Sequence, residues 1–160
     1  MTPLLQVTGL TRHYGRIVAL DALSFSVHEG EILGLIGPNG AGKTTVFECL
    51  GGVRPADQLA ITHLGKSLAA TDLNSVLFYL PDAITPWPAQ SVSWALDYTL
   101  GLFGGRRDLR EDVVRSLDLS SLLERPLGKL SKGQRKRALL AIGLLTPQPV
   151  LIAEIGRAHV

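Results

Sequence analysis

The sequence is poor in the features that would place it in a specialised structural class. One cysteine in 160 residues rules out an internal disulfide and fits a reducing compartment. Aromatic residues make up only 6%, and a net charge of +2 gives no electrostatic case for nucleic-acid binding. No apolar run approaches the roughly 18 residues that span a bilayer. The first 15 residues also lack the basic-then-apolar pattern of a signal peptide, so we expect none.

What remains is an ordinary folding composition, with strand-like segments in the first half. The chain is 46% hydrophobic, which predicts one folded domain, or one domain with a small subdomain. Residues 4–10 and 17–37 carry the apolar and β-branched residues of strands, with Gly30 as a turn. Residues 33–36 read as a short buried strand, and residues 75–80 as another.

Helical spacing dominates the second half. Residues 91–103, 110–124 and 131–145 have apolar residues at helical intervals, and residues 149–153 form a final buried-strand run. Strands on both sides of helices predict an α/β fold. A helical subdomain is expected over about residues 87–130.

The strongest chemical signal is a glycine-rich loop between a predicted strand and a predicted helix. It matches G-x-x-x-x-G-K-[ST] at Gly37, Gly42, Lys43 and Thr44. Glycines let successive amides curl into an anion-binding nest at a helix N-terminus. The lysine adds charge for the β- and γ-phosphates, and the threonine hydroxyl binds Mg²⁺. The loop therefore predicts a nucleoside triphosphate site, and the alternative is a chance glycine turn.

A second stretch, "LSKGQRKR", opens the third helix. Ser131 followed by Gln134 predicts a capping box. Cations crowd the first turns at positions 132, 135, 136 and 137, where each opposes the helix dipole by about 0.3–1 kcal/mol. An arriving anion would remove that penalty, so this helix start is interpreted as a second phosphate site. The alternative is a solvated basic helix face.

Together these two stretches resemble the ATP-binding cassette (ABC) family. "GPNGAGKTT" is similar to its Walker A loop, and "LSKGQ" to its signature, usually LSGGQ, with Lys132 at a variable position. The resemblance implies a P-loop NTPase core with an N-terminal antiparallel β region, ATP and Mg²⁺ as ligands, and a head-to-tail dimer. The implied nucleotide-binding residues are Gly37, Pro38, Asn39, Gly40, Ala41, Gly42, Lys43, Thr44, Thr45 and, reaching the partner's γ-phosphate, Ser131, Gly133 and Gln134.

The resemblance also carries individual positions. Tyr14 matches the family aromatic that stacks on adenine, with a buried core tyrosine as the alternative. Asp82 stands where the family usually has the Q-loop glutamine. A carboxylate is a good Mg²⁺ ligand, so Thr44 and Asp82 are the candidate metal ligands, although Asp82 lacks an amide donor. Cys49 is expected to be a small buried residue.

The helical subdomain of ABC transporters docks a membrane subunit. Trp87 and Trp94 fall in this region, and exposed tryptophans are effective interface anchors. We nevertheless expect at least one of them to pack in the core, and an exposed pair that anchors an interface is the alternative.

The end of the sequence departs from the family. Glu154 follows an apolar strand at the Walker B aspartate position, and Ile155 stands where the catalytic glutamate belongs. His159 comes too early to be the switch histidine. Residues 155–160, "IGRAHV", match the translation of a common sequencing-library adapter. We expect a non-native tail after an incomplete ABC domain over residues 1–154 that lacks the C-terminal part of its core, and little or no ATP hydrolysis.

The function implied is that of the ATPase subunit of an ABC transporter. It would pair with a second ATPase subunit, identical or not, and with transmembrane permease subunits on the cytoplasmic face of the membrane. A non-transport ABC ATPase acting on ribosomes or DNA, an unrelated P-loop kinase or GTPase, and a non-hydrolysing nucleotide-binding paralogue are the alternatives. Substrate and direction of transport are not encoded in these residues.

Overall fold

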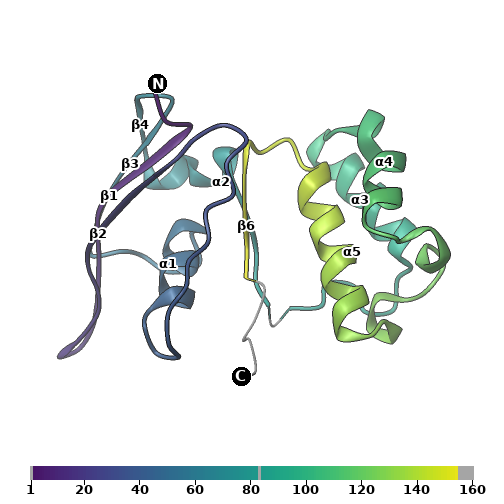
Figure 1. Ribbon diagram of the computed structural model, residues 1–160, viewed down its shortest axis with the longest axis horizontal. Coiled ribbons are helices and arrows are strands. Elements are labelled where there is room, and N and C mark those ends of the chain that lie inside the picture. The colour runs from purple at the N-terminus through teal and green to yellow at the C-terminus, as the bar shows by residue number, and fades with distance from the viewer. Residues whose placement is uncertain (1, 83, 155–160) are drawn as a thin grey trace. The chain divides into compact units, whose positions relative to one another are not determined.

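The structure is a computed structural model that describes residues 2–82 and 84–154. The chain divides into two compact units, Met1–Leu77 and Phe78–Val160, and each is described by itself (Figure 1). The expected tail at residues 155–160 lies outside the described residues.

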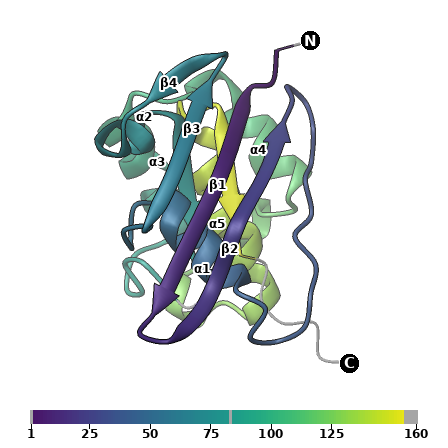
Figure 2. The same ribbon diagram turned by 90° about the vertical axis from the view of Figure 1, so that its left-hand side faces the viewer.

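The first unit is built on an antiparallel sheet with the strand order β2-β1-β3-β4 (Figure 2). The strands are β1 (Leu5–Tyr14), β2 (Ile17–Val27), β3 (Gln58–His63) and β4 (Lys66–Leu68). Leu5 of β1 lies opposite Val27 on one side and His63 on the other. The predicted antiparallel β region and the turn at Gly30, where φ is +73°, are confirmed. The β3–β4 hairpin was not predicted, because only six and three residues form its strands.

One helix covers the apolar face of this sheet. Helix α1 (Lys43–Leu50) buries Val46, Cys49 and Leu50. The strands contribute alternate buried residues, Leu5, Val7, Leu10, Leu20 and Ile61. A short 3₁₀ turn (Ala70–Asp72) leads into α2 (Leu73–Val76). The predictions of a helix after the glycine loop and of a buried Cys49 are confirmed.

The predicted buried strand at residues 33–36 is wrong. This segment joins neither sheet, and Ile32 and Ile36 beside and within it are 97% and 95% exposed. Residues 32–36 are almost entirely apolar, a pattern typical of a central strand that is buried on both faces. Such a strand needs neighbours for its N–H and C=O groups. The first unit by itself does not supply them, so the segment stays unpaired.

The second unit packs three helices around one core. These are α3 (Val92–Phe103), α4 (Arg110–Ser116) and α5 (Lys132–Leu145), joined by 3₁₀ turns at Arg107–Leu109, Ser120–Leu122 and Leu127–Lys129. The helices predicted at 91–103 and 131–145 are confirmed. The helix predicted at 110–124 stops at Ser116, because Asp118 adopts a left-handed φ of 50°. None of the described helices is long and apolar enough for a membrane span.

A two-stranded sheet completes the second unit. It pairs β5 (Leu77–Leu80) with β6 (Val150–Ala153), and the Glu154 N–H donates to the Leu80 carbonyl at 2.9 Å. Helix α5 packs closely on it through Gly143, where a Cβ would lie only 2.6 Å from Leu151 Cδ1. The strand predicted at 149–153 is confirmed, and the one predicted at 75–80 starts later because Leu73–Val76 is helical.

Candidate nucleotide-binding site

The glycine loop ends in a helix whose N-terminus has no side-chain cap. Helix α1 begins at Lys43, and its N-cap residue is Gly42, with φ +85°. The first bond of the helix runs from the Val46 N–H to the Gly42 carbonyl at 2.9 Å. An α-helix leaves its first N–H groups without intrahelical partners, and these groups attract anions. The first turn of α1 carries no acidic side chain that would take this role.

Gly42 is required here for two separate reasons. Its φ of +85° is a left-handed conformation that costs an L-residue about 1–2 kcal/mol. A Cβ at this position would also lie 2.6 Å from the Ala19 carbonyl oxygen and 2.9 Å from Leu20 Cδ2. Gly40 has a similar φ of +84° but open space around it. The loop therefore rests directly on β2 at Gly42 alone.

The ammonium group of Lys43 lies inside the curve of the loop. It donates to the carbonyls of Gly37 and Pro38, each at 2.7 Å. A lysine has three N–H donors, so one donor remains beyond these two bonds. A cation held in this place suits the β- and γ-phosphates of a nucleotide. The residues present therefore fit the ligand that the motif predicts.

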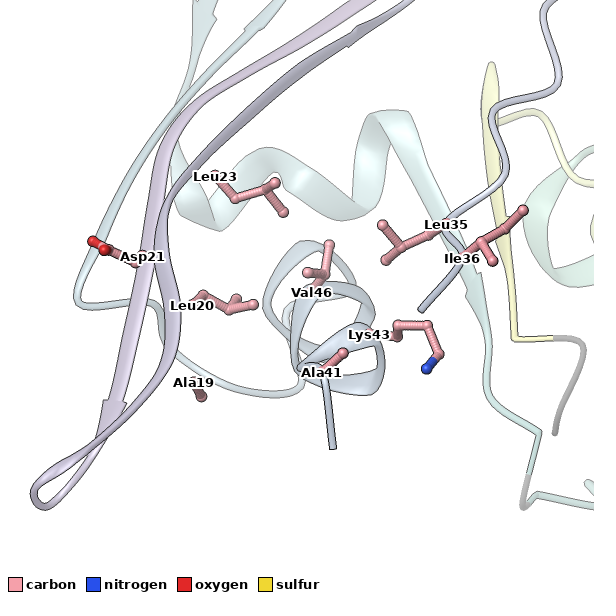
Figure 3. A pocket seen from close by; sticks show the side chains of 9 residues that line it. All are labelled: Ala19, Leu20, Asp21, Leu23, Leu35, Ile36, Ala41, Lys43 and Val46. Carbon is pink, nitrogen blue, oxygen red and sulfur yellow. The ribbon is translucent and has the colours of Figure 1, made fainter. Parts of the chain in front are cut away.

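A shallow pocket beside the loop is a different feature. Its volume is ≈ 220 Å³, below the about 300–1,000 Å³ typical of small-molecule sites. Figure 3 shows Leu20, Leu23, Leu35 and Val46 pointing toward the same space, and Asp21 pointing away from it. The pocket is thus an apolar gap between β2, α1 and the unpaired residues 33–36.

Tyr14 ends β1 with its ring half-exposed, which does not fit a buried core tyrosine. The guanidinium carbons of Arg12 and Arg54 lie 5.1 and 5.9 Å from its ring centroid. Arg12 is paired with Asp57 at 3.0 Å, and Arg54 is paired with Glu48. A side-chain hydrogen bond with His13 is the main cause that lowers the pKa of Asp57. Adenine stacking on Tyr14 stays a prediction.

The signature stretch forms the capping box that the sequence predicts. The Ser131 hydroxyl oxygen accepts from the Gln134 N–H at 3.3 Å, and the Gln134 side chain accepts from the Ser131 N–H at 3.0 Å. Because the hydroxyl acts as an acceptor in this bond, its own proton remains available for a second acceptor. A Cβ at Gly133 would meet nothing within 4 Å. The contact of Ser131 and Gly133 with a partner's γ-phosphate stays a prediction.

The interpretation that the cations of this helix await an anion is wrong for Lys136 and Arg137, which already have carboxylate partners, and untested for the other two. Arg135 donates to the Thr85 hydroxyl at 3.0 Å and to the Leu130 carbonyl at 3.2 Å. Lys136 pairs with Asp82 at 2.8 Å, and Arg137 pairs with Asp118 at 2.9 Å. These partners are internal, and sequence reasoning missed the side-chain partners Thr85, Asp82 and Asp118 because they lie far from the helix in the sequence. Lys132 has no such partner within the second unit's described residues.

Glu154, at the Walker B aspartate position, lies where β5 and β6 end. Its N–H is bonded to Leu80, and its carboxylate accepts from the Tyr79 hydroxyl at 3.1 Å. Asp82 follows the same end of β5. The structure thus gathers the two carboxylates at the ends of neighbouring strands of the second unit, whereas the glycine loop and Tyr14 belong to the first. Tyr79 gave no signal in the sequence.

The expectation that at least one tryptophan packs in the core is wrong, because Trp87 and Trp94 are both partly exposed. With Tyr98 they form an aromatic cluster. Trp94 and Tyr98 stack with centroids 4.8 Å apart, and Trp87 meets them edge-on at 5.7 and 5.1 Å. The three rings are 37–42% exposed. Tyr98 was missed, although it lies four positions after Trp94 on the same helix face.

The first unit carries a glycine loop that leads into α1 beside an antiparallel sheet, and the second unit carries a capped helix start. These features are typical of a P-loop nucleotide-binding protein. Residues 20–154 match the sequence model of the ABC transporter family. The chain therefore belongs to the ABC family.

Relatives and solved structures agree with this family assignment. The SkfA peptide export ATP-binding protein SkfE of Bacillus subtilis is 34% identical, over 86% of this chain and 59% of its own. The phosphonates import ATP-binding protein PhnC 1 of Natronomonas pharaonis is 35% identical, over 94% and 68%. An ATP-binding subunit of an ABC transporter shares the fold with a TM-score of 0.79 at 24% identity, over 94% of this chain and 65% of its own.

The chain is shorter than these relatives. It spans 59% of SkfE, and only 46% of the Nod factor export ATP-binding protein I of Sinorhizobium fredii. The ABC_tran match ends at residue 154, the last described residue.

Proposed function

We propose that this chain is the ATP-binding subunit of an ABC transporter and that it binds Mg²⁺–ATP through the loop from Gly37 to Thr45. The observation that carries the proposal is the Lys43 ammonium held inside that loop, 2.7 Å from two of its carbonyls. When bound, Mg²⁺ neutralises charge on the β- and γ-phosphates. Thr44, in the first turn of α1, supplies a hydroxyl ligand for the metal. Tyr14 stacks on the adenine.

The same subunit pairs head to tail with a second ATPase subunit. The start of α5 presents Ser131 and Gly133 to the γ-phosphate bound by the partner. The capping box supports this role because it fixes the Ser131 side chain and leaves its proton to donate. The open space at Gly133 lets a phosphate approach the backbone closely. Gln134 acts through the capping box.

Hydrolysis by these 160 residues is slow. The family places a general base directly after the Walker B position, and this sequence has Ile155 there. A general base contributes about 10²- to 10⁴-fold to a rate. Glu154 is engaged by Tyr79, and its side chain is longer than the aspartate that orients Mg²⁺ in the family. Turnover at the rate of an intact ABC ATPase would contradict this part of the proposal.

The membrane partner docks at the aromatic cluster, Trp87, Trp94 and Tyr98. Backbone bonds fix the loop before α3: Gly128 donates to Pro88 at 2.8 Å and Leu127 to Gln90 at 2.9 Å. Trp87 has a φ of 46°, strain that persists where the surroundings enforce a conformation. Rigid exposed aromatics are typical interface anchors. The permease subunits place the chain on the cytoplasmic face of the membrane.

Titration with a fluorescent ATP analogue tests nucleotide binding by the purified chain. We expect saturable, Mg²⁺-dependent binding that ATP displaces and that Lys43→Ala weakens. Binding that is equally tight in Lys43→Ala would overturn the proposal. Co-expression with a membrane protein encoded beside this gene tests docking: Trp94→Ala should reduce co-purification, and Leu144→Ala, also an exposed apolar residue on a helix, should not.

A further inference from the structure

Two neighbouring cations of α5 reach the residues that follow β5. Lys136 Nζ lies 2.8 Å from Asp82 Oδ1, and these side chains are 29% and 27% exposed. Arg135 Nη1 lies 3.0 Å from the Thr85 hydroxyl. These two contacts together form the loop–helix clamp. All four residues belong to the second unit.

Arg135 links this clamp directly to the start of the signature helix. Its second nitrogen, Nη2, donates to the carbonyl of Leu130 at 3.2 Å. Leu130 immediately precedes Ser131, the N-cap of α5, and is itself buried. One planar guanidinium therefore joins Thr85 to the residue that leads into the capping box. Arginine suits this role because its donors are held in a rigid fork.

The clamp also explains why α5 tolerates cations near its N-terminus. Each exposed cation there opposes the helix dipole. The carboxylate of Asp82 offsets the charge of Lys136 where both are partly shielded from solvent, so their attraction is less screened than on an open surface. Asp82 is thus already engaged by an ammonium group, which competes with a role as a metal ligand.

We propose that Asp82 is a positioning residue that acts through Lys136 and, with Thr85 and Arg135, holds the start of α5 where it meets a partner's nucleotide. This proposal rests on the function proposed above. The clamp sets the position of the α5 N-terminus.

Hydrogen exchange and nucleotide titration on the 160-residue protein test the clamp. Lys136→Met and Asp82→Asn should each raise amide exchange over residues 131–137 about 5-fold, since each removes the ion pair between these partly buried side chains and leaves the other partner without it. The charge-swapped pair Asp82→Lys with Lys136→Asp should restore exchange to within about twofold. Lys132→Met, a matched cation without such a partner, should not raise exchange, since it only removes a charge that opposes the helix dipole.

Nucleotide titration distinguishes a positioning role of the clamp from a general effect on the stability of the protein. Binding of a fluorescent ATP analogue should stay within about twofold in Lys136→Met, whereas the ATP concentration for half-maximal self-association should rise about 5-fold. Wild-type exchange in Lys136→Met, no recovery in the swapped pair, or an equal rise throughout α3 would overturn the clamp. A wild-type chain that binds ATP without self-associating, or undiminished binding in Lys43→Ala, counts against the proposed function, and the exchange arm still decides the clamp.

Discussion

Two helix N-termini in this chain are treated in opposite ways. Helix α1 starts at a left-handed glycine and has no side-chain cap, whereas α5 starts at Ser131 within a complete capping box. The basic residue at the first position of α1, Lys43, turns back into its own loop. The basic residues in the second turn of α5 are bonded to other parts of the second unit.

The difference shows that two helix starts with nearby basic residues can satisfy their backbone N–H groups in different ways. The start of α1 has no side-chain cap, and only glycine fits where the loop touches β2. The start of α5 is held by the reciprocal bonds of Ser131 and Gln134. The start of α1 is therefore called open, and the capped start of α5 closed.

The largest expected effect comes from closing the space at the open helix start. Gly42→Ala should lower the free energy of unfolding by about 2–5 kcal/mol, because left-handed strain adds to a backbone clash with Ala19. Chemical denaturation measures this loss. Gly104→Ala is the matched control, since Gly104 also has a positive φ but nothing within 4 Å of its would-be Cβ. Equal losses in the two variants would contradict the close approach at Gly42.

Removing the loop cation should weaken nucleotide binding without unfolding the chain. Lys43→Ala is expected to raise the Kd for an ATP analogue about 10- to 100-fold, as charge-assisted bonds contribute about 1.5–3 kcal/mol. Isothermal titration gives the Kd directly. Lys132→Ala changes the first residue of the closed helix start instead and should leave the Kd unchanged. A similar loss in both would show that net charge, not the loop, governs binding.

Opening the closed helix start has a smaller expected effect. Ser131→Ala removes the cap and should cost about 1 kcal/mol of stability, seen as faster exchange in the first turn of α5. Ser131→Thr keeps a hydroxyl cap and should behave nearly as wild type. If Ser131→Ala were silent, the capping box would not hold α5.

The last prediction has the smallest effect on stability and concerns the rate at which a thiol reagent labels Cys49. Cys49 is buried on the inner face of α1, and burial raises the pKa of its thiol. Because the thiolate is the reactive form, its fraction at pH 7 is lower than for an exposed cysteine. A thiol reagent should therefore label native protein far more slowly than urea-unfolded protein. Rapid labelling of the native chain would mean that α1 is not packed on the sheet.

The sequence was sufficient where the signal is local. The glycine loop, the capping box, α3 and α5 follow from short motifs and helical spacing, and the structure has them. It was insufficient where a contact spans distant positions. Nothing near Lys136 in the chain indicates that Asp82 lies beside it, and this lysine was therefore assigned to an arriving anion. The strand predicted at residues 33–36 was also wrong for a non-local reason. Its composition suits a strand between two neighbours, and the first unit does not provide them.

The segment at residues 32–36 bears on the thermodynamics of association. Residues 32–36 form no ladder bonds with other described residues, so the arm that enters the loop is tethered chiefly through the bonds of Lys43 to Gly37 and Pro38. Two large apolar side chains, Ile32 and Ile36, therefore face solvent within the first unit. Any element that covered them would gain about 25 cal/mol for each Å² of apolar surface removed from water, and its association would show a negative heat-capacity change.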